Sequence, residues 1–352
     1  MTVENNPIRV VVVDDSALMR RVLSDILNSD MNIEVVATAR DPFDAREKIK
    51  LHNPDVITLD VEMPRMDGLQ FLKNLMRLRP MPVVMVSSLT TRHAGVTLEA
   101  MQMGAFDFVA KPEIDIARGL AESGQDIIEK VKAASQANVT HLATLAHARI
   151  PLAAPKISSY RTTDQLIAIG ASTGGTEAIR VVLQGMPADC PGIVIVQHIP
   201  GMFSSSFAER LNSLCCVTVK EAEDGDRILS GHVYIAPGEK HLSVVRDGAQ
   251  YRCRVSDEDP VNRHRPSVDV LFHSVATAAG SNATGVILTG MGKDGAIGMK
   301  AMHDKGAYTI AQSEQSSVVW GMPGSAVRLE GVDRVVELVD IAELLASSTA
   351  HA

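Results

Sequence analysis

Residues 8–21 read IRVVVVDDSALMRR, and this stretch indicates the fold of the first part of the chain. A short apolar run comes first, which is typical of a buried strand, and two aspartates follow it directly. Ser16 then fits the N-cap of a helix near residues 16–28. The same order of apolar run, polar end and amphipathic stretch recurs over the first 137 residues. The pattern predicts alternating strands and helices around a parallel sheet.

The recurring pattern predicts five strands in this part of the chain. They are expected over residues 8–13, 33–37, 55–59, 82–86 and 105–109. Helices are expected near residues 16–28, 42–52, 68–78 and 92–102. Five such units within about 130 residues predict a doubly wound (βα)5 domain of the α/β class. Ligands of such sheets bind outside the carboxyl ends of the strands.

Polar side chains stand at those strand ends. Asp14 and Asp15 follow the first strand, Asp60 the third, Ser87 the fourth and Lys111 the fifth. Carboxylates that converge on one edge repel each other unless a cation lies among them, and an open oxygen cage suits Mg²⁺. A hydroxyl and an ammonium beside them suit a phosphoryl group. The alternative is that each aspartate only caps the next helix, which explains one position but not five.

Four segments carry a resemblance to a known family: VVVDDSALMRR, ITLDVEMPRMDG, VVMVSS and GAFDFVAKP. Together they resemble the receiver domain of two-component response regulators, over about residues 8–130. The resemblance implies that Asp60 accepts a phosphoryl group from a chemotaxis histidine kinase. It implies that Mg²⁺ is held by Asp14, Asp15, Asp60 and the backbone carbonyl of Glu62.

The same resemblance assigns the remaining polar positions of the first domain. Ser87 and Lys111 are expected to bind the phosphoryl oxygens. Phe108 matches the switch aromatic, where the family often has tyrosine, so the packing is kept and the hydroxyl is lost. These roles are implied by the family and not by the spacing of the residues.

Glycine and charge divide the chain. Residues 1–137 contain 5 of the 25 glycines and residues 164–352 contain 20. Between them the chain carries Arg149, Lys156 and Arg161 without any acidic residue. We therefore predict a first domain over residues 1–137, a linker over 138–162 and a second domain over 163–352. The second domain needs many tight turns or close backbone approaches.

Three apolar strands are predicted in the second domain, over residues 166–169, 193–196 and 285–288. Ser172, His198 and Asp294 follow them in that order, each just beyond a strand that leads towards a helix. If the strands are parallel neighbours, the three side chains lie on one rim of a parallel-sheet α/β domain. A serine nucleophile needs a base, and the base needs a carboxylate, so the set suits nucleophilic catalysis.

Two other interpretations use the same loops. Ser172 lies in a G-x-S-x-G match that resembles the nucleophile elbow of α/β-hydrolases, but the order serine, histidine, aspartate differs from theirs. Gly290-x-Gly292-x-x-Gly295, with Glu314 further on, fits a dinucleotide fingerprint. Asp294 argues against that fingerprint because its carboxylate would meet the pyrophosphate at the helix N-terminus. A purely structural role for the glycines and helix caps is the remaining alternative.

Six segments of the second domain carry a further resemblance: IGASTGG, VIVQHIPGMF, HVYIAPGEKHL, HRPSVDVLFHSVA, GVILTGMGKDGAIGM and IAQSEQSSVVWGMP. Together they resemble the catalytic domain of chemotaxis receptor methylesterases, the CheB family, over about residues 163–346. The implied substrates are γ-methyl esters of glutamate on methyl-accepting chemoreceptors, with glutamine deamidation as a related activity. No cofactor is expected for ester hydrolysis.

The resemblance and the chemistry together predict the roles of the site residues. Ser172 attacks the ester, His198 transfers the proton and Asp294 orients the imidazole. Backbone amides near Met291 and Thr173 are expected to bind the oxyanion, and Thr173 is expected to hydrogen-bond His198. A catalytic role for His264 is an alternative, but it follows no strand end, so we interpret it as loop support. The neighbouring arginines, Arg263 and Arg265, are interpreted either as steering acidic receptor helices or as a solvated loop.

Composition narrows the remaining function classes. The 352-residue chain has a net charge of −8 and only 3% aromatic residues, which disfavours nucleic-acid binding. The second domain shows no helix-turn-helix pattern, which disfavours a DNA-binding regulator. The N-terminus lacks a secretory signal, and no apolar run approaches the length of a membrane span. With four cysteines and no CxxC pair, we expect a cytoplasmic protein without membrane insertion.

Overall fold

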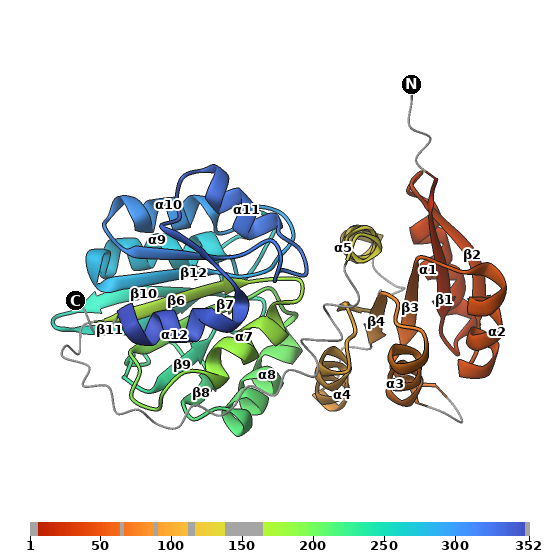
Figure 1. Ribbon diagram of the computed structural model, residues 1–352, viewed down its shortest axis with the longest axis horizontal. Helices are drawn as coiled ribbons and strands as arrows, with labels where there is room; N and C mark the ends of the chain where they lie inside the picture. The colour runs from red at the N-terminus through yellow and green to blue at the C-terminus, as the bar shows by residue number, and fades with distance from the viewer. Residues whose placement is uncertain (1–5, 64–66, 88–90, 112–116, 138–164, 349–352) are drawn as a thin grey trace. The chain divides into compact units, whose positions relative to one another are not determined.

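The structure is a computed structural model of the chain, and it divides into two compact units over residues 1–148 and 149–352 (Figure 1). It describes residues 6–63, 67–87, 91–111, 117–137 and 165–348. The predicted linker, residues 138–162, lies outside the described residues, so its boundaries remain a prediction. Each unit is described by itself below.

The first unit is built around one five-stranded sheet. Its strands are β1 (Ile8–Val13), β2 (Ile33–Ala39), β3 (Val56–Asp60), β4 (Val83–Ser87) and β5 (Asp107–Ala110). Its helices are α1 (Ala17–Asn28), α2 (Pro42–His52), α3 (Gly68–Leu78), α4 (Thr91–Gln102) and α5 (Ala117–Ser135). The strand order is β2-β1-β3-β4-β5 and every pairing is parallel, which confirms the predicted doubly wound (βα)5 fold.

The ends of the elements follow from the local sequence. Ser16 caps α1 as predicted, because its hydroxyl accepts a hydrogen bond from the Met19 N–H at 3.3 Å. Asp41 and Asp67 cap α2 and α3 in the same way. Strands β3 and β4 are buried along their whole length, as expected for a sheet covered on both faces.

The second unit contains a seven-stranded sheet in the order β14-β13-β12-β6-β7-β9-β8, again wholly parallel. Its strands are β6 (Leu166–Ala171), β7 (Gly192–Gln197), β8 (Thr218–Glu221), β9 (His232–Ile235), β12 (Ala283–Ile287), β13 (Tyr308–Gln312) and β14 (Arg334–Val336). The chain passes from β6 to one side of the sheet and returns at β12 on the other side. The crevice of such a sheet lies at this reversal, between β6 and its neighbours.

Helices cover both faces of the second sheet, as Figure 1 shows. One layer holds α9 (Val268–Ala278), α10 (Ala296–Asp304) and α11 (Gly321–Arg328). The other holds α7 (Gly175–Gln184), α8 (Gly201–Leu214) and α12 (Leu338–Ser348). A core of buried side chains fills the space between the sheet and α9, with Phe272 and Met299 among them. Burial of this apolar surface is the main term that holds the layers together.

The second unit also contains an antiparallel hairpin, which the parallel-sheet prediction did not include. Strands β10 (His241–Asp247) and β11 (Gln250–Ser256) pair with each other and lie against α9. Burial alternates only over the first half of β11, and the first half of β10 is mostly buried while its end is exposed. Among the described helices, none combines the length and apolar character needed to cross a bilayer.

Candidate functional site

The first unit gathers acidic side chains at the carboxyl ends of its strands. Asp14 follows β1 and Asp60 ends β3, and both are buried, whereas Asp15 is exposed. Carboxylate oxygens of these three residues lie within 4.8 Å of one another. Lys111, which follows β5, places its Nζ 2.8 Å from Asp60 Oδ2 and 3.1 Å from Asp14 Oδ2. The predicted convergence of charged residues on one edge therefore exists in the structure.

The donor set fits a small divalent cation. All three candidate side-chain ligands are carboxylates, the type of ligand that Mg²⁺ prefers. Asp14 Oδ2 is buried, and the Lys111 ammonium, 3.1 Å away, is the one partner that the described residues show for it. The backbone of Glu62 lies beside the cluster, since its N–H donates to Asp60 Oδ1 at 3.2 Å. A metal ion would satisfy the buried oxygen and reduce the repulsion between the aspartates.

The two other predicted phosphoryl-site residues lie beside this cluster on neighbouring strands. Ser87 ends β4, is fully buried and accepts a hydrogen bond from Thr97 Oγ1 at 3.1 Å. Phe108, in β5, is buried with 3% of its surface exposed. The Lys130 ammonium lies 5.5 Å from its ring centroid and donates to the Phe108 carbonyl at 2.6 Å. The aromatic position is thus held by α5 in the conformation described here.

The Asp60 carboxyl group predicts a pH-dependent stability for the first unit. Burial raises its pKa from 3.8 to about 6, the Asp14 charge adds to the effect, and Lys111 opposes it. The folded chain therefore holds a proton more tightly than the unfolded chain, so stability falls as the pH rises from about 4 to about 6. With Mg²⁺ chelated, Asp60→Asn should stabilise the first unit by about 1–3 kcal/mol above pH 6 and by little below pH 4.

Scanning calorimetry of the full chain with a chelator measures this effect. Tryptophan fluorescence would not follow the first unit, because the single tryptophan, Trp320, belongs to the second unit. Asp25→Asn is the matched control, since Asp25 is an exposed carboxylate on α1 whose side chain is 75% exposed. An Asp60→Asn protein that gains no stability above pH 6 would contradict the burial argument.

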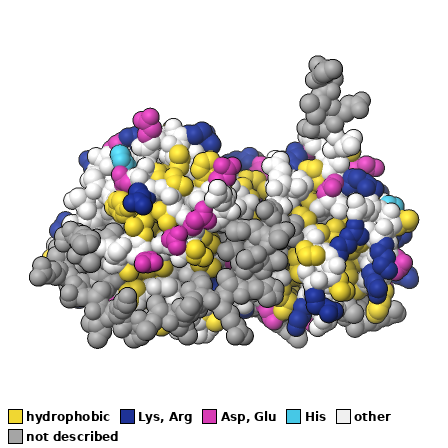
Figure 2. Space-filling view, in the orientation of Figure 1, with side chains coloured by type: hydrophobic (Ala, Val, Ile, Leu, Met, Phe, Trp, Pro, Cys, Tyr) yellow, Lys and Arg dark blue, Asp and Glu magenta, His cyan; other side chains and the backbone are white. Residues whose placement is uncertain are grey.

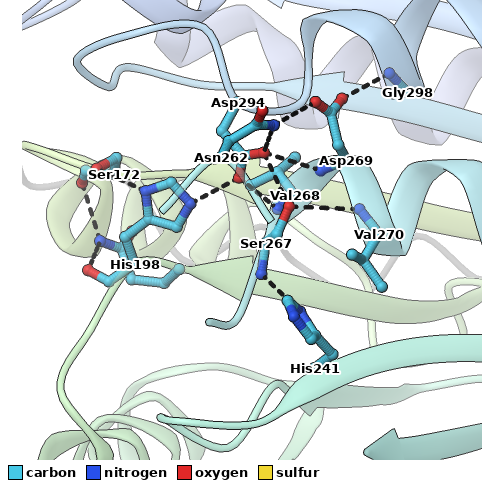
Figure 3. A network of polar contacts seen from close by, with 11 residues as sticks. Ser172, His198, His241, Asn262, Ser267, Val268, Asp269, Val270, Asp294 and Gly298 are labelled. Atoms are coloured by element: carbon cyan, nitrogen blue, oxygen red, sulfur yellow. Dashed lines mark hydrogen bonds and ion pairs between the residues drawn. The ribbon is translucent and has the colours of Figure 1, made fainter. Parts of the chain in front are cut away.

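In the second unit, Ser172, His198 and Asp294 meet at the carboxyl edge of the sheet, as Figure 3 shows. Strands β12, β6 and β7 are adjacent and parallel, so the residues that follow them lie side by side. Ser172 Oγ lies 3.1 Å from His198 Nδ1, and His198 Nε2 lies 2.9 Å from Asp294 Oδ2. The structure therefore brings together the three predicted residues in one hydrogen-bonded line.

The contacts define how the imidazole of His198 must be protonated to act as a base. Nδ1 has to be free of its proton to accept one from Ser172, so Nε2 carries the hydrogen and donates it to Asp294. Burial raises the pKa of Asp294, but hydrogen bonds from His198, Asn262 and the Val268 N–H outweigh it, and the net pKa lies below its ordinary value. Asp294 is accordingly a carboxylate at neutral pH.

The surroundings of Asp294 contain residues that the sequence did not single out. Its carboxylate accepts hydrogen bonds from Asn262 Nδ2 at 2.7 Å, Ser267 Oγ at 2.8 Å and the Val268 N–H at 2.7 Å (Figure 3). The last of these donors lies at the N-terminus of α9, where the helix dipole favours a negative charge. These contacts occupy the carboxylate of the loop that also fits a dinucleotide fingerprint, which further disfavours nucleotide binding there. Only the polar character of the segment VNRHRPS hinted at this network.

Thr173 does not make the contact expected for it. Both ring nitrogens of His198 face other residues, and the described contacts include no hydrogen bond between Thr173 and His198. Thr173 is buried, and its carbonyl accepts from Thr289 Oγ1 at 3.0 Å. Within the described part of the chain, no acceptor is assigned to the backbone N–H of Thr173 or of Met291. These two amides are therefore available for an oxyanion.

A close backbone approach explains one glycine of the site. A Cβ at Gly290 would lie 2.8 Å from the Ser172 Cβ and 2.3 Å from Met322 Sδ. The Gly290 carbonyl also accepts the N–H groups of Gly321 and Met322, at 3.1 and 2.8 Å. The glycine therefore lets three loops pack together around the serine. A side chain at this position would push these loops apart.

His264 lies against the site although no strand end presents it. Its ring stacks on that of His198 with the centroids 3.8 Å apart and the planes inclined by 14°. Sequence reasoning interpreted this residue as loop support, and the contact makes it a direct neighbour of the imidazole. No local signal in the sequence predicts such a contact, because it joins residues 66 positions apart.

The fold and the two sites define a class: a receiver-type unit joined to a parallel-sheet α/β unit with a serine, a histidine and an aspartate at its carboxyl edge. The family model for the CheB methylesterase domain matches residues 167–345, and that for the response regulator receiver domain matches residues 10–135. The chain belongs to the CheB methylesterase family and carries an N-terminal receiver domain.

The names of similar proteins agree with this assignment. The chain is 57% identical over the full length of both chains to protein-glutamate methylesterase/protein-glutamine glutaminase 2 of Xanthomonas oryzae pv. oryzae. It is 58% identical to the protein-glutamate methylesterase/protein-glutamine glutaminase of Salmonella typhimurium, across 96% of this chain and 95% of the relative. The CheB methylesterase catalytic domain of Thermotoga maritima superposes with a TM-score of 0.52 at 37% identity, covering 53% of this chain and all of that domain.

Proposed function

We propose that this protein hydrolyses γ-methyl esters of glutamate on methyl-accepting chemoreceptors, with Ser172 as nucleophile, His198 as base and Asp294 as orienting carboxylate. The hydrogen-bonded line from Ser172 Oγ through the imidazole to Asp294 carries the proposal. Membership of the CheB methylesterase family supports the substrate class. A cytoplasmic location, where the methylated receptor helices lie, forms part of the proposal.

Acylation follows from the contacts of Ser172. Its Oγ attacks the ester carbonyl carbon while His198 Nδ1, 3.1 Å away, takes the hydroxyl proton. The imidazolium that forms is stabilised by the Asp294 carboxylate at 2.9 Å. The same Nδ1 then returns the proton to the leaving oxygen, so that methanol departs and an acyl-enzyme remains.

Deacylation repeats these steps with water in place of the serine. His198 Nδ1 takes a proton from the water, the water oxygen attacks the acyl carbon, and Ser172 leaves with the proton restored. The product is a glutamate carboxylate. With a glutamine side chain as substrate, ammonia takes the place of methanol in the first half, which gives the deamidase activity.

The oxyanion of both tetrahedral intermediates needs hydrogen-bond donors. The backbone N–H groups of Thr173 and Met291 are the donors we assign, because they flank Ser172 and have no assigned acceptor within the described residues. Thr173 follows the serine directly, and Met291 follows Gly290, where an added Cβ would lie 2.8 Å from the Ser172 Cβ. Donors of this kind act only on the charge that develops in the reaction. In this mechanism, side chains transfer the protons and form the acyl-enzyme, and backbone amides bind the oxyanion.

The first unit is proposed to regulate the second by phosphorylation. Asp60 would accept the phosphoryl group from a chemotaxis histidine kinase, and Ser87 and Lys111 would bind its oxygens. Mg²⁺, held by Asp14, Asp15, Asp60 and the Glu62 carbonyl, would neutralise negative charge on the transferred group. Phe108 would report the change through its packing. The buried Asp60–Lys111 pair and the receiver-family match support this assignment.

We propose that the protein neither binds nucleic acid nor inserts into membranes. On the face drawn in Figure 2, Lys and Arg side chains are most frequent over the first unit, where acidic ones lie among them, and both kinds are scattered over the described part of the second unit. A protein that neutralises many phosphates needs a concentrated basic surface instead. The net charge of −8 supports the same conclusion.

Methanol release from methylated receptor membranes tests the function directly. The full chain should release methanol in proportion to enzyme, and the rate should increase when Mg²⁺ and a small acyl phosphate are added together. Either addition alone should leave the basal rate unchanged. Failure to release methanol from methylated receptors under any of these conditions would refute the proposed activity.

A further inference from the structure

The segment between β11 and α9 contains a tight turn beside the site. Val261 and His264 exchange two backbone hydrogen bonds, of 3.1 and 2.9 Å. Between them Asn262 and Arg263 have φ values of 53° and 67°, so both central residues are left-handed, as in a type I′ turn. Asparagine tolerates this conformation better than most residues. The turn presents the side chains of Asn262 and His264 to two different members of the proposed triad.

Asn262 joins two buried carboxylates. Its Nδ2 donates to Asp294 Oδ1 and to Asp269 Oδ2, each at 2.7 Å (Figure 3). Because both partners are acceptors, the amide nitrogen and not its oxygen must face them. Asp269 is itself held by the Gly298 N–H at 2.6 Å, at α10. The amide therefore fixes Asp294 relative to two helices.

His264 contacts His198, the member of the proposed triad that hydrogen-bonds Asp294. Its ring covers one face of the His198 imidazole at a centroid distance of 3.8 Å. A stacked ring allows the imidazole to tilt little out of its plane, and this plane contains both Nδ1 and Nε2. The two nitrogens must point at Ser172 and Asp294 at once, so a tilt would lengthen both contacts.

His241, on β10, anchors the segment at both ends. Its Nδ1 accepts the Ser267 N–H at 3.2 Å, and its Nε2 donates to the Asp259 carbonyl at 3.1 Å. The residue is 1% exposed, so the ring has little freedom to move. One buried imidazole therefore ties residue 259 to residue 267 and closes the segment into a loop.

From these contacts we infer that residues 259–267 form a positioning loop, in which Asn262 holds Asp294 and His264 holds the His198 ring for proton transfer. The inference rests on the triad assigned under the proposed function and adds two positioning residues to it. Neither residue transfers a proton or contacts the substrate carbonyl. Their contribution is to keep the Nδ1 and Nε2 contacts of His198 in line.

Steady-state methanol release by full-length variants tests the loop. His264→Ala should lower kcat by about 10- to 100-fold while KM stays within about twofold, because orientation and not substrate binding is lost. His264→Phe keeps a stacking ring and should stay within about threefold of the parent kcat. Asn262→Gly keeps the left-handed turn without the amide and should lower kcat by about 10-fold or more.

A spectroscopic measurement separates positioning from general destabilisation. In ¹⁵N-histidine-labelled protein, His198 should show one tautomer with the hydrogen on Nε2, and its signal is assigned by its loss in His198→Gln. His264→Ala and Asn262→Gly should give mixed tautomers, and His264→Phe should not. His273→Ala, at an exposed position on α9, is the matched control and should leave the rate and the tautomer unchanged.

The outcomes distinguish the two proposals. An active Ser172→Ala protein would overturn the proposed function itself. An inactive Ser172→Ala protein together with unaltered His264→Ala and Asn262→Gly would overturn only the positioning loop. Equal losses in His264→Phe and His264→Ala would also overturn it, because stacking would then not be the role of His264. The positioning loop would also be overturned if kcat fell only in proportion to the fraction of folded protein while the His198 tautomer stayed unchanged.

Discussion

Replacing Ser172 with alanine is expected to lower methanol release from methylated receptors by about 10⁴- to 10⁶-fold. The variant lacks the Ser172 Oγ that lies 3.1 Å from His198 Nδ1, so no acyl-enzyme can form. Any remaining rate would come from water placed by the oxyanion donors. The measurement is methanol release per enzyme with the receiver phosphorylated, since this condition gives the widest range.

The fold should tolerate this change. Ser172 is only partly buried, and the substitution removes one hydroxyl without opening a large cavity. The thermal midpoint should therefore move little, and the variant should still bind methylated receptors. Ser205→Ala, at an exposed position on α8, is the matched control and should keep the parent rate. A Ser172→Ala protein within tenfold of the parent would exclude the proposed nucleophile.

Asp60→Asn is expected to reduce phosphoryl incorporation to background and to remove the response of the esterase to phosphodonor. An amide cannot form the acyl phosphate, and it gives up the charge that pairs with Lys111 at 2.8 Å. The basal rate of methanol release should stay unchanged, because the change lies in the other unit. Labelling from a small acyl phosphate and methanol release are measured on the same preparation.

The control for this variant is again Asp25→Asn, which changes one exposed carboxylate of the same unit. It should be labelled and stimulated like the parent. Labelling that persists in Asp60→Asn would show that another residue accepts the phosphoryl group. If Asp60→Asn lost labelling but its esterase were still stimulated by the phosphodonor, phosphorylation of Asp60 would not be the regulatory step.

Much of the fold follows from local patterns. The five strands of the first unit and its helices α1 to α4 lie within about two residues of their predicted positions, because apolar runs and caps such as Ser16 mark them directly, whereas α5 was not predicted. The convergence of Asp14 with Asp60, and of Ser172 with His198, could be inferred because neighbouring parallel strands end at one edge. The sequence did not predict the β10–β11 hairpin, whose alternating pattern was weak.

Other parts of the site depend on contacts that no local pattern encodes. The stacking of His264 on His198 and the Asn262 bridge between Asp269 and Asp294 need a left-handed turn and a buried anchor on another strand. Which imidazole nitrogen faces Ser172 is likewise set by the rotamer of His198 and not by its position in the chain. The expected Thr173 contact was wrong because both nitrogens were already occupied.

The strand order of the second sheet has a consequence for biosynthesis. The serine and histidine follow adjacent strands that are made early, whereas their carboxylate partner comes 96 residues after the histidine, in the loop after β12, a strand that inserts on the opposite side of β6. A nascent or truncated chain that ends before residue 294 therefore has a nucleophile and a base without the carboxylate that orients the imidazole. Esterase activity should emerge only when translation of the domain is nearly complete, while the receiver can fold first on the ribosome.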